Sequence, residues 1–219
     1  MSISENLNKI KSTIPKNVAL VAVSKTKPVS DLMEAYNAGQ RVFGENKIQE
    51  MTEKWEQMPK DIQWHMIGHV QTNKVKFIAE YVNLIHGVDS LKLLQEINKQ
   101  AAKQNRVIDC LLQIYIAEEE SKFGLDENEL NDILQSEEFK SMQNMEVIGL
   151  MGMATFTDNQ IQIKKEFQNL KNIFDKYKSL NIEHCKLNTI SMGMSGDYKL
   201  AIECGSTMVR IGSSIFGER

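Results

Sequence analysis

The chain has 219 residues, 42% of them hydrophobic and 25% charged, with a formal net charge of −3, which is the composition of a soluble globular protein. It contains no long basic run, and this argues against a dedicated nucleic-acid binder, because neutralising a phosphate backbone requires clustered lysines and arginines. Its three cysteines, Cys110, Cys185 and Cys204, form no CxxC pair, so we expect no disulfide framework, no thiolate zinc site and a reducing compartment. The N-terminal segment lacks the apolar stretch of a signal peptide and no run is long enough to span a membrane, so we expect a cytoplasmic protein without membrane association.

The first predicted elements are a strand and the helix that follows it. Residues 18–23 (VALVAV) are apolar and rich in β-branched valine, which is typical of a strand buried on both faces. The next segment predicts a helix with Ser30 as N-cap, Leu32 and Ala35 on its apolar face, and Gly39 at its end.

The same alternation of strand and helix continues to the end of the chain. Further strands are predicted at 41–43, 63–67, 84–88, 107–116, 145–151, 187–192 and 208–211. A helix that begins at Ser90 continues through Leu94 to Ala101. Another carries an apolar stripe from Ile163 to Tyr177 at helical spacing.

Repeated strand–helix alternation predicts parallel strands covered by helices. Eight such units close naturally into a (β/α)8 barrel, and an open doubly wound sheet is the competing interpretation. The chain has only three prolines and no linker rich in Pro, Gly or Ser. We therefore expect an α/β protein whose residues 1–219 form one barrel domain.

Lys25 is the first candidate functional residue, because it follows VALVAVS and so lies at the carboxyl end of the first strand. In barrels that end carries the chemistry. A lysine withdrawn from water favours its neutral amine, the form that attacks an aldehyde or ketone, and the nearby Lys27 pushes in the same direction. On its own, however, a lysine at a strand end is more often a solvated surface cation.

Two segments near the C-terminus predict a phosphate site. Residues 191–197 (SMGMSGD) follow the seventh strand, with Gly193 and Gly196 permitting close backbone approach and Ser195 as the expected N-cap of a helix. Residues 210–214 (RIGSS) follow the eighth strand, and the loops after strands seven and eight are a frequent phosphate site in such barrels. Glycine and serine are common in any loop, but the double occurrence suggests, together with Lys25, a phosphorylated aldehyde cofactor or a class I aldolase acting on a phosphorylated substrate.

Other features receive no catalytic or metal-binding role. His65 and His69 straddle a strand end and a glycine, where their spacing does not align two metal ligands. The acidic run 118–120 is interpreted as a solvated loop. Four methionines are expected inside the barrel or on the pocket floor: Met151, Met153, Met192 and Met194.

Six strings then resemble those of the YggS-like pyridoxal phosphate homeostasis proteins, in the expected order and over nearly the whole chain. They are VAVSKTKP (21–28), FGENKIQE (43–50), WHMIGHVQTNK (64–74), HGVDS (86–90), GLMGMATF (149–156) and SMGMSGDYKLAIECGSTMVRIGSSIFG (191–217). The last string is highly specific. The resemblance implies the barrel of fold type III, related to the N-terminal domain of alanine racemase, with pyridoxal 5′-phosphate (PLP) as cofactor.

The resemblance also implies residue roles. Lys25 matches the lysine that forms the internal aldimine, Arg210 matches the arginine that faces the pyridine nitrogen, and Asn46 matches a residue at the pocket edge. The remaining cofactor-binding positions match the family's phosphate-binding segments: Ser191, Gly193, Met194, Ser195, Gly212 and Ser213.

An arginine can only donate hydrogen bonds, so a ring nitrogen paired with Arg210 stays unprotonated and the ring is a poorer electron sink. Alanine racemase also needs a second, β-rich domain, and we expect none here, because the chain ends after the eighth unit. The resemblance thus implies vitamin B6 homeostasis: a protein that holds PLP, without established enzyme activity, with delivery to PLP-dependent apo-enzymes left open. A PLP-dependent racemase or lyase is the alternative. We expect a monomer, because a racemase-type dimer would lose much of its interface.

Overall fold

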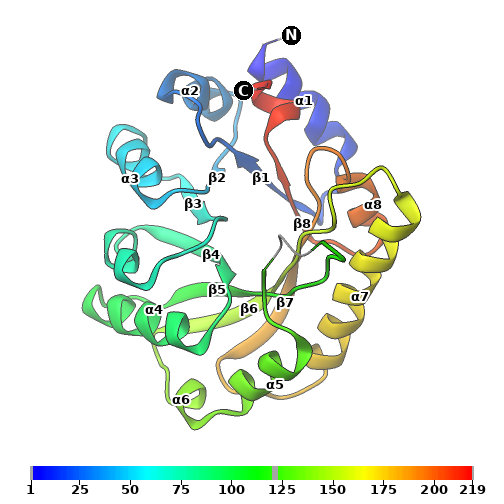
Figure 1. The fold of residues 1–219 in the computed structure, drawn as a ribbon. Coiled ribbons are helices and arrows are strands. Elements are labelled where there is room, and N and C mark those ends of the chain that lie inside the picture. The colour runs from blue at the N-terminus through cyan, green and yellow to red at the C-terminus, as the bar shows by residue number, and fades with distance from the viewer. Residues whose placement is uncertain (1, 120–122, 219) are drawn as a thin grey trace.

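The computed structural model describes residues 2–119 and 123–218 of the chain. Eight parallel strands form a closed barrel in which each strand pairs with its neighbours in chain order, and β1 pairs with β8. Helices surround the strands (Figure 1). The predicted (β/α)8 barrel is therefore confirmed, and the open doubly wound sheet is excluded, because an open sheet has two unpaired edges.

All the predicted strands form, with boundaries close to those expected from the apolar runs. They are β1 (Ala19–Val23), β2 (Val42–Glu45), β3 (Gln63–Met66), β4 (Val82–Val88), β5 (Ile108–Gln113), β6 (Met145–Met151), β7 (Cys185–Ser191) and β8 (Met208–Ile211). Their carboxyl ends meet at one mouth, where the loops that follow the strands converge.

The helices are α1 (Ile3–Thr13), α2 (Val29–Asn37), α3 (Ile48–Gln57), η1 (Thr72–Phe77), α4 (Leu91–Lys103), α5 (Glu127–Gln135), α6 (Glu137–Lys140), α7 (Gln160–Lys178), α8 (Tyr198–Glu203) and α9 (Ser213–Phe216). Helix α1 precedes β1 and α9 follows β8; the other helices lie between the strands, and a short 3-10 helix, η1, connects β3 to β4. No helix among the described residues is long and apolar enough to cross a membrane.

Helix ends test the capping predictions one by one. Ser90 is the N-cap of α4, and its hydroxyl accepts the N–H of Leu93 at 3.3 Å. Gly39 ends the α2 region with φ +85°, a conformation that glycine adopts without strain. The prediction for Ser30 is wrong. The N-cap of α2 is Pro28, because the chain is already helical at Val29, so Ser30 lies within the first turn.

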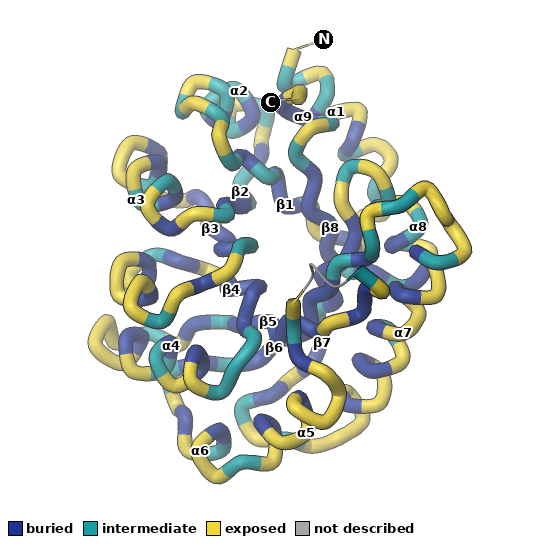
Figure 2. The backbone as a smooth tube through the Cα atoms, in the orientation of Figure 1, coloured by how far each residue is buried: buried dark blue, intermediate teal, exposed yellow. Residues whose placement is uncertain are grey.

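Burial separates the barrel into two apolar layers. In Figure 2 the strands and the inward sides of the helices are buried, whereas the outward sides of the helices are exposed. The larger cluster packs strands against helices and includes Met192. The smaller cluster, to which Met151 belongs, consists of Val21, Leu84, Leu111, Met151 and Met208. Met192 is fully buried in the larger cluster and does not line the cavity described below.

The two ends of the described chain lie side by side (Figure 1). The Asn6 side chain in α1 donates a hydrogen bond to the carbonyl of Ile215 in α9 at 3.1 Å. The segment after α9 then passes the mouth, where Lys27 Nζ donates to the carbonyl of Glu218 at 2.9 Å. The C-terminal segment therefore forms part of the wall around the site described next.

Candidate functional site

A cavity of about 620 Å³ opens at the carboxyl ends of the strands. Most of the residues singled out in the sequence line it: Lys25, Asn46, Met194, Ser195, Arg210, Gly212 and Ser213. The other lining residues are Val23, Lys27, Ile67, Met153, Phe156, Gly196, Asp197, Gly217 and Glu218. The structure therefore brings the predicted lysine, the predicted arginine and both glycine–serine segments to one space.

Lys25 enters this cavity from a turn directly after β1 and is half-buried. Its neighbour Ser24 is fully buried, and Thr26 has φ +65°, an uncommon conformation for a β-branched residue. The second lysine, Lys27, also lines the cavity, but its ammonium group is bound to the Glu218 carbonyl.

Arg210 is a buried side chain of β8 whose guanidinium is fixed by three acceptors. Nη1 donates to the carbonyl of Ser191 at 2.8 Å and to its Oγ at 2.7 Å, and Nη2 donates to the carbonyl of Gly152 at 3.1 Å. Burial lowers the pKa of Arg210 to about 10, and the nearby Asp197 opposes part of this shift. Arg210 therefore remains a cation at neutral pH and presents hydrogen-bond donors to the cavity.

Ser191 connects Arg210 to two buried histidines. His86 Nδ1 lies 3.0 Å from Ser191 Oγ, and His86 Nε2 lies 3.0 Å from His65 Nδ1. Burial lowers the pKa of His65 to about 3 and that of His86 well below its usual value. Both imidazoles are therefore neutral at pH 7. Here, His65, His86, Ser191 and Arg210 are called the imidazole chain.

The structure does not bring every predicted residue to the cavity surface. Ser191 is fully buried and its hydroxyl is already engaged by Arg210 and His86. Gly193 lies behind the wall with φ +97°, and a Cβ there would lie 2.6 Å from Ala201 Cβ. Both residues shape the wall from behind rather than lining the cavity.

The loop between β7 and α8 forms the C-terminal wall, but it does so without the predicted cap. The N-cap of α8 is Asp197, so the prediction that Ser195 caps this helix is wrong. Instead, Ser195 Oγ accepts the N–H of Gly212 at 3.3 Å and so joins the two glycine–serine segments. Asp197 Oδ1 accepts the N–H of Met194 at 2.5 Å, and burial raises the pKa of Asp197.

The loop after β6 supplies an apolar rim, in which Met153 lines the cavity as expected and Phe156 is a residue that the sequence patterns did not reveal. Phe156 is 93% exposed although it lines the cavity, and Met153 lies beside it in the same loop. Thr155 anchors this loop, since its N–H and hydroxyl both donate to the Glu166 carboxylate at 2.7 Å.

The acidic run 118–120 was predicted to be a solvated loop. The Glu118 side chain is 56% exposed, as predicted, and it pairs with Lys165 at 3.0 Å. Residue 120 lies outside the described residues.

His65 and His69, which were expected not to form a metal pair, make separate contacts. His65 is buried against His86, whereas His69 Nδ1 lies 3.5 Å from Asp89 and its side chain is 55% exposed. Their rings therefore belong to different environments at the end of β3.

Known proteins of one family match the chain along its whole length. The alanine racemase N-terminal domain family matches residues 1–219. The pyridoxal phosphate homeostasis protein of Pasteurella multocida strain Pm70 is 37% identical over 232 residues, which cover 100% of this chain and 98% of the relative. This chain belongs to the pyridoxal phosphate homeostasis protein family.

Solved structures agree with this family. PipY of Synechococcus elongatus PCC7942, solved without PLP, has a TM-score of 0.92 and 32% identity, covering 99% of this chain and 100% of PipY. The PipY structure with PLP bound has a TM-score of 0.88 over the same shares. Alanine racemase of Clostridium difficile 630, at 16% identity and a TM-score of 0.80, shares the fold: it covers 100% of this chain and 56% of the racemase.

Proposed function

We propose that this chain holds PLP in the cavity at the barrel mouth, attached to Lys25, and thereby serves intracellular PLP homeostasis. The observation that carries the proposal is the convergence of Lys25, Arg210 and the two glycine–serine segments on one cavity. The PLP-bound structure of PipY, which shares the fold and 32% of the sequence, supports it.

The residues of the cavity fit the chemistry of PLP. The ligand has an aldehyde, a pyridine nitrogen and a phosphate, and the cavity offers an amine, a fixed cation and hydroxyl and backbone donors beside Ser195 and Ser213. Val23, Ile67 and Met153 add apolar surface for a flat ring. The volume of about 620 Å³ lies in the range of small-molecule sites.

When bound, PLP supplies an aldehyde carbon that a neutral lysine amine can attack. Lys25 would supply that amine and so would hold the cofactor covalently. Lys25 is half-buried in the turn directly after β1, so this turn places its side chain at the cavity. Water can hydrolyse such a linkage, so Lys25 would hold the cofactor reversibly.

Arg210 would hold the ring end of the ligand. Its guanidinium is fixed by Ser191 and Gly152, and it can donate but not accept hydrogen bonds. A partner of this kind does not stabilise added negative charge in the ring as a carboxylate-held pyridinium does. Arg210 therefore favours holding the cofactor over turning it over.

Ser195, Ser213 and the backbone around Gly196 and Gly212 would hold the phosphate. A Cβ at Gly196 would meet no atom within 4 Å, so the backbone there faces open space. Asp197 also lines the cavity, but its Oδ1 is directed to the Met194 N–H and burial raises the pKa of this carboxyl. This contact limits its repulsion of a phosphate.

A PLP-dependent racemase or lyase of fold type III is the second candidate. Such an enzyme needs an acid or base beside the α-carbon of its substrate. Among the described residues that line the cavity, the titratable groups are Lys25, Lys27, Asp197, Arg210 and Glu218, with no tyrosine or histidine. Exchange of the α-proton of an amino acid into deuterated water, measured by NMR, would favour this candidate, whereas we expect no exchange above the rate of free PLP.

The proposal extends to how the protein works in the cell. We propose that the protein is a single-domain cytoplasmic monomer. We also propose that it passes PLP to PLP-dependent apo-enzymes, because the cavity opens at the surface and water can reverse the attachment to Lys25. Light scattering should give the 25.0 kDa mass of one chain, and twice that mass would contradict the monomer. Activation of an apo-enzyme by the loaded protein faster than by PLP released into bulk water would support direct delivery.

The function is tested by absorption spectroscopy of purified protein with added PLP. The wild type should show the yellow band of lysine-linked PLP, and Lys25→Ala should lack it. Lys27→Ala is the matched control, since it removes the same charge from the same cavity and should keep the band. A colourless wild type, or a Lys25→Ala variant that binds PLP equally well, would contradict the proposal and favour a class I aldolase or another phosphate-ester site.

A further inference from the structure

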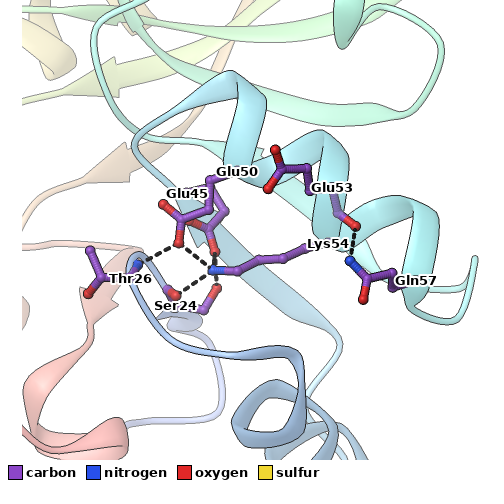
Figure 3. Close-up of polar contacts among 7 residues, drawn as sticks. All are labelled: Ser24, Thr26, Glu45, Glu50, Glu53, Lys54 and Gln57. Atoms are coloured by element: carbon purple, nitrogen blue, oxygen red, sulfur yellow. Dashed lines mark hydrogen bonds and ion pairs between the residues drawn. The ribbon is translucent and has the colours of Figure 1, made fainter.

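A buried cluster of charged groups lies directly behind the turn that carries Lys25 (Figure 3). It consists of Ser24, Glu45, Glu50 and Lys54, here called the ion cluster. Lys54 is only 5% exposed and Glu45 is fully buried, whereas the Glu50 side chain is 22% exposed. Removing charged groups from water is unfavourable unless each is paired. The deep burial of Lys54 therefore needs an explanation.

The ammonium group of Lys54 is fully satisfied by this cluster. Its Nζ donates to the Ser24 carbonyl, to Glu45 Oε1 and to Glu50 Oε1, each at 2.7 Å. An ammonium group has three donors, and all of them are used. The ends of β1 and β2 and the first turns of α3 are thereby tied to one nitrogen atom.

The cluster also fixes the residue on each side of Lys25. Before it, Ser24 is held through its carbonyl by Lys54 and through its hydroxyl, which donates to Glu45 Oε1 at 2.6 Å. After it, the Thr26 N–H donates to Glu50 Oε1 at 2.5 Å. Thr26 has φ +65°, a strained conformation that persists only where surrounding contacts enforce it. The backbone of Lys25 is therefore bracketed by contacts to the same group of charges.

None of these charged side chains reaches the cavity. Glu45, Glu50 and Lys54 are absent from its lining residues, so they do not contact a ligand bound there. Any effect on the ligand must pass through the turn of residues 24–26. This separates the ion cluster from Arg210, which lines the cavity itself.

We propose that Glu50 and Lys54, together with Glu45, are positioning residues that hold the Lys25 turn so that its amine faces the PLP aldehyde. The inference rests on the proposed function above. Capture of an aldehyde by an amine is sensitive to the position of the nitrogen, because the reacting atoms must approach within a narrow range of distances and angles. Phosphate and ring contacts do not depend on this turn, so the cluster should affect covalent capture and leave non-covalent binding of the ligand unchanged.

The experiment compares Glu50→Ala with Glu53→Ala. Both remove one carboxylate from α3, but Glu53 is exposed and its carboxylate accepts only the side-chain amide of Gln49 among the hydrogen bonds of the described residues. The side-chain amide of Gln57 donates to the backbone carbonyl of Glu53, which the substitution keeps (Figure 3). Each variant is titrated with PLP, followed by the yellow band, and with pyridoxine 5′-phosphate, followed by calorimetry. The second ligand carries an alcohol in place of the aldehyde and so cannot form the bond to Lys25.

We expect Glu50→Ala to raise the apparent dissociation constant for PLP about tenfold, with less than a twofold change for pyridoxine 5′-phosphate. Glu53→Ala should match the wild type for both ligands. Glu50→Gln keeps an oxygen acceptor for the Thr26 N–H and should restore most of the PLP affinity. The melting temperature without ligand reports any general loss of structure.

Two results would overturn the positioning role: Glu50→Ala indistinguishable from Glu53→Ala, or Glu50→Ala weakening both ligands equally. Both are read against a wild type that shows the yellow band, so the proposed function survives them. A wild type without the band is a different failure, because it removes the proposed function and this inference together.

Discussion

Two buried polar groups flank the cavity, and they are built in opposite ways. The ion cluster uses two carboxylates and the ammonium of Lys54 to tie β1, β2 and α3 together. The imidazole chain runs from His65 in β3 through His86 in β4 and Ser191 in β7 to Arg210 in β8. Since β3 and β8 are not neighbours, this chain crosses the inside of the barrel.

The difference lies in how each group carries charge. The ion cluster holds formal charges of both signs close together, and these charges fix a backbone turn. The loss of any one partner would leave another buried charge unpaired. The imidazole chain holds a single formal charge, on Arg210, and two imidazoles that burial keeps neutral. The neutral imidazoles leave the donors of Arg210 available to a ligand. A carboxylate in their place would compete with the ligand for these donors, and a second cation would compete with Arg210 for the ligand.

Disrupting the ion cluster should destabilise the protein most. Lys54→Met keeps the length of the side chain but leaves Glu45, which is fully buried, without its ammonium partner. The free energy of unfolding should fall by about 3–5 kcal/mol in urea titrations. Lys99→Met is the control, because Lys99 is 62% exposed and pairs with Glu96 at 3.4 Å, and it should change the value by less than about 0.5 kcal/mol. Equal effects of both variants would show that burial of the Lys54 pair carries no special weight.

The imidazole chain should make the protein sensitive to acid. The pKa of His65 is about 3 in the folded chain against 6.5 for an ordinary histidine, because burial disfavours the cation. Between these values the unfolded chain binds a proton that the folded chain refuses, so stability is complete above about pH 6.5 and declines as pH falls, by about 1.4 kcal/mol per pH unit. In urea titrations between about pH 6 and pH 4, the free energy of unfolding should decline less steeply with falling pH in His65→Gln than in the wild type, by about 1.4 kcal/mol per pH unit. Parallel slopes would contradict the burial of a neutral imidazole.

Two serine variants should separate the contributions of the two polar groups. Ser191 and Ser24 are both fully buried, and each hydroxyl belongs to one of the two groups. Ser191→Ala removes a partner from Arg210 and from His86, so unfolding should become easier by about 2–3 kcal/mol. Ser24→Ala removes one donor from Glu45, which keeps Lys54, and should lower the free energy of unfolding by about 1 kcal/mol. A larger loss in Ser24→Ala would reverse the order expected from the contacts.

The smallest effect is expected at the rim. Phe156 is 93% exposed, so Phe156→Ser removes little buried surface and should change the free energy of unfolding by less than about 0.5 kcal/mol. Thermal denaturation without ligand tests this. A clear loss of stability would mean that Phe156 packs against the barrel in solution. The rim loop would then lie against the same barrel wall as the ion cluster and the imidazole chain.

Much of the fold could be predicted from the sequence because its signals are local. The valine-rich run of β1 and the apolar stripe of α7 each indicate one element, and their regular alternation specifies the barrel. Lys25 could be placed at the mouth for the same reason, since it directly follows a strand. The segments around Ser195 and Ser213 follow the last two strands and reach the cavity accordingly.

The remaining features depend on contacts between distant residues. Glu50 and Lys54 have the i, i+4 spacing of an ordinary exposed helix pair, and nothing in the spacing shows that Lys54 is buried against Ser24. His86 carries no pattern of its own until β4 places it between His65 and Ser191. Ser195 resembled a helix cap, but the loop extends to Asp197 and leaves its hydroxyl to Gly212.

Lys25 should be the residue that carries PLP. The most direct test is to load the wild type with PLP, reduce it with borohydride, digest it and locate the added mass by tandem mass spectrometry. Reduction converts the reversible linkage into a stable amine, so the label marks the nitrogen that held the cofactor. We expect one labelled peptide, modified at Lys25, in near-stoichiometric yield. A label on Lys27, a label scattered over surface lysines, or no label at all would contradict it.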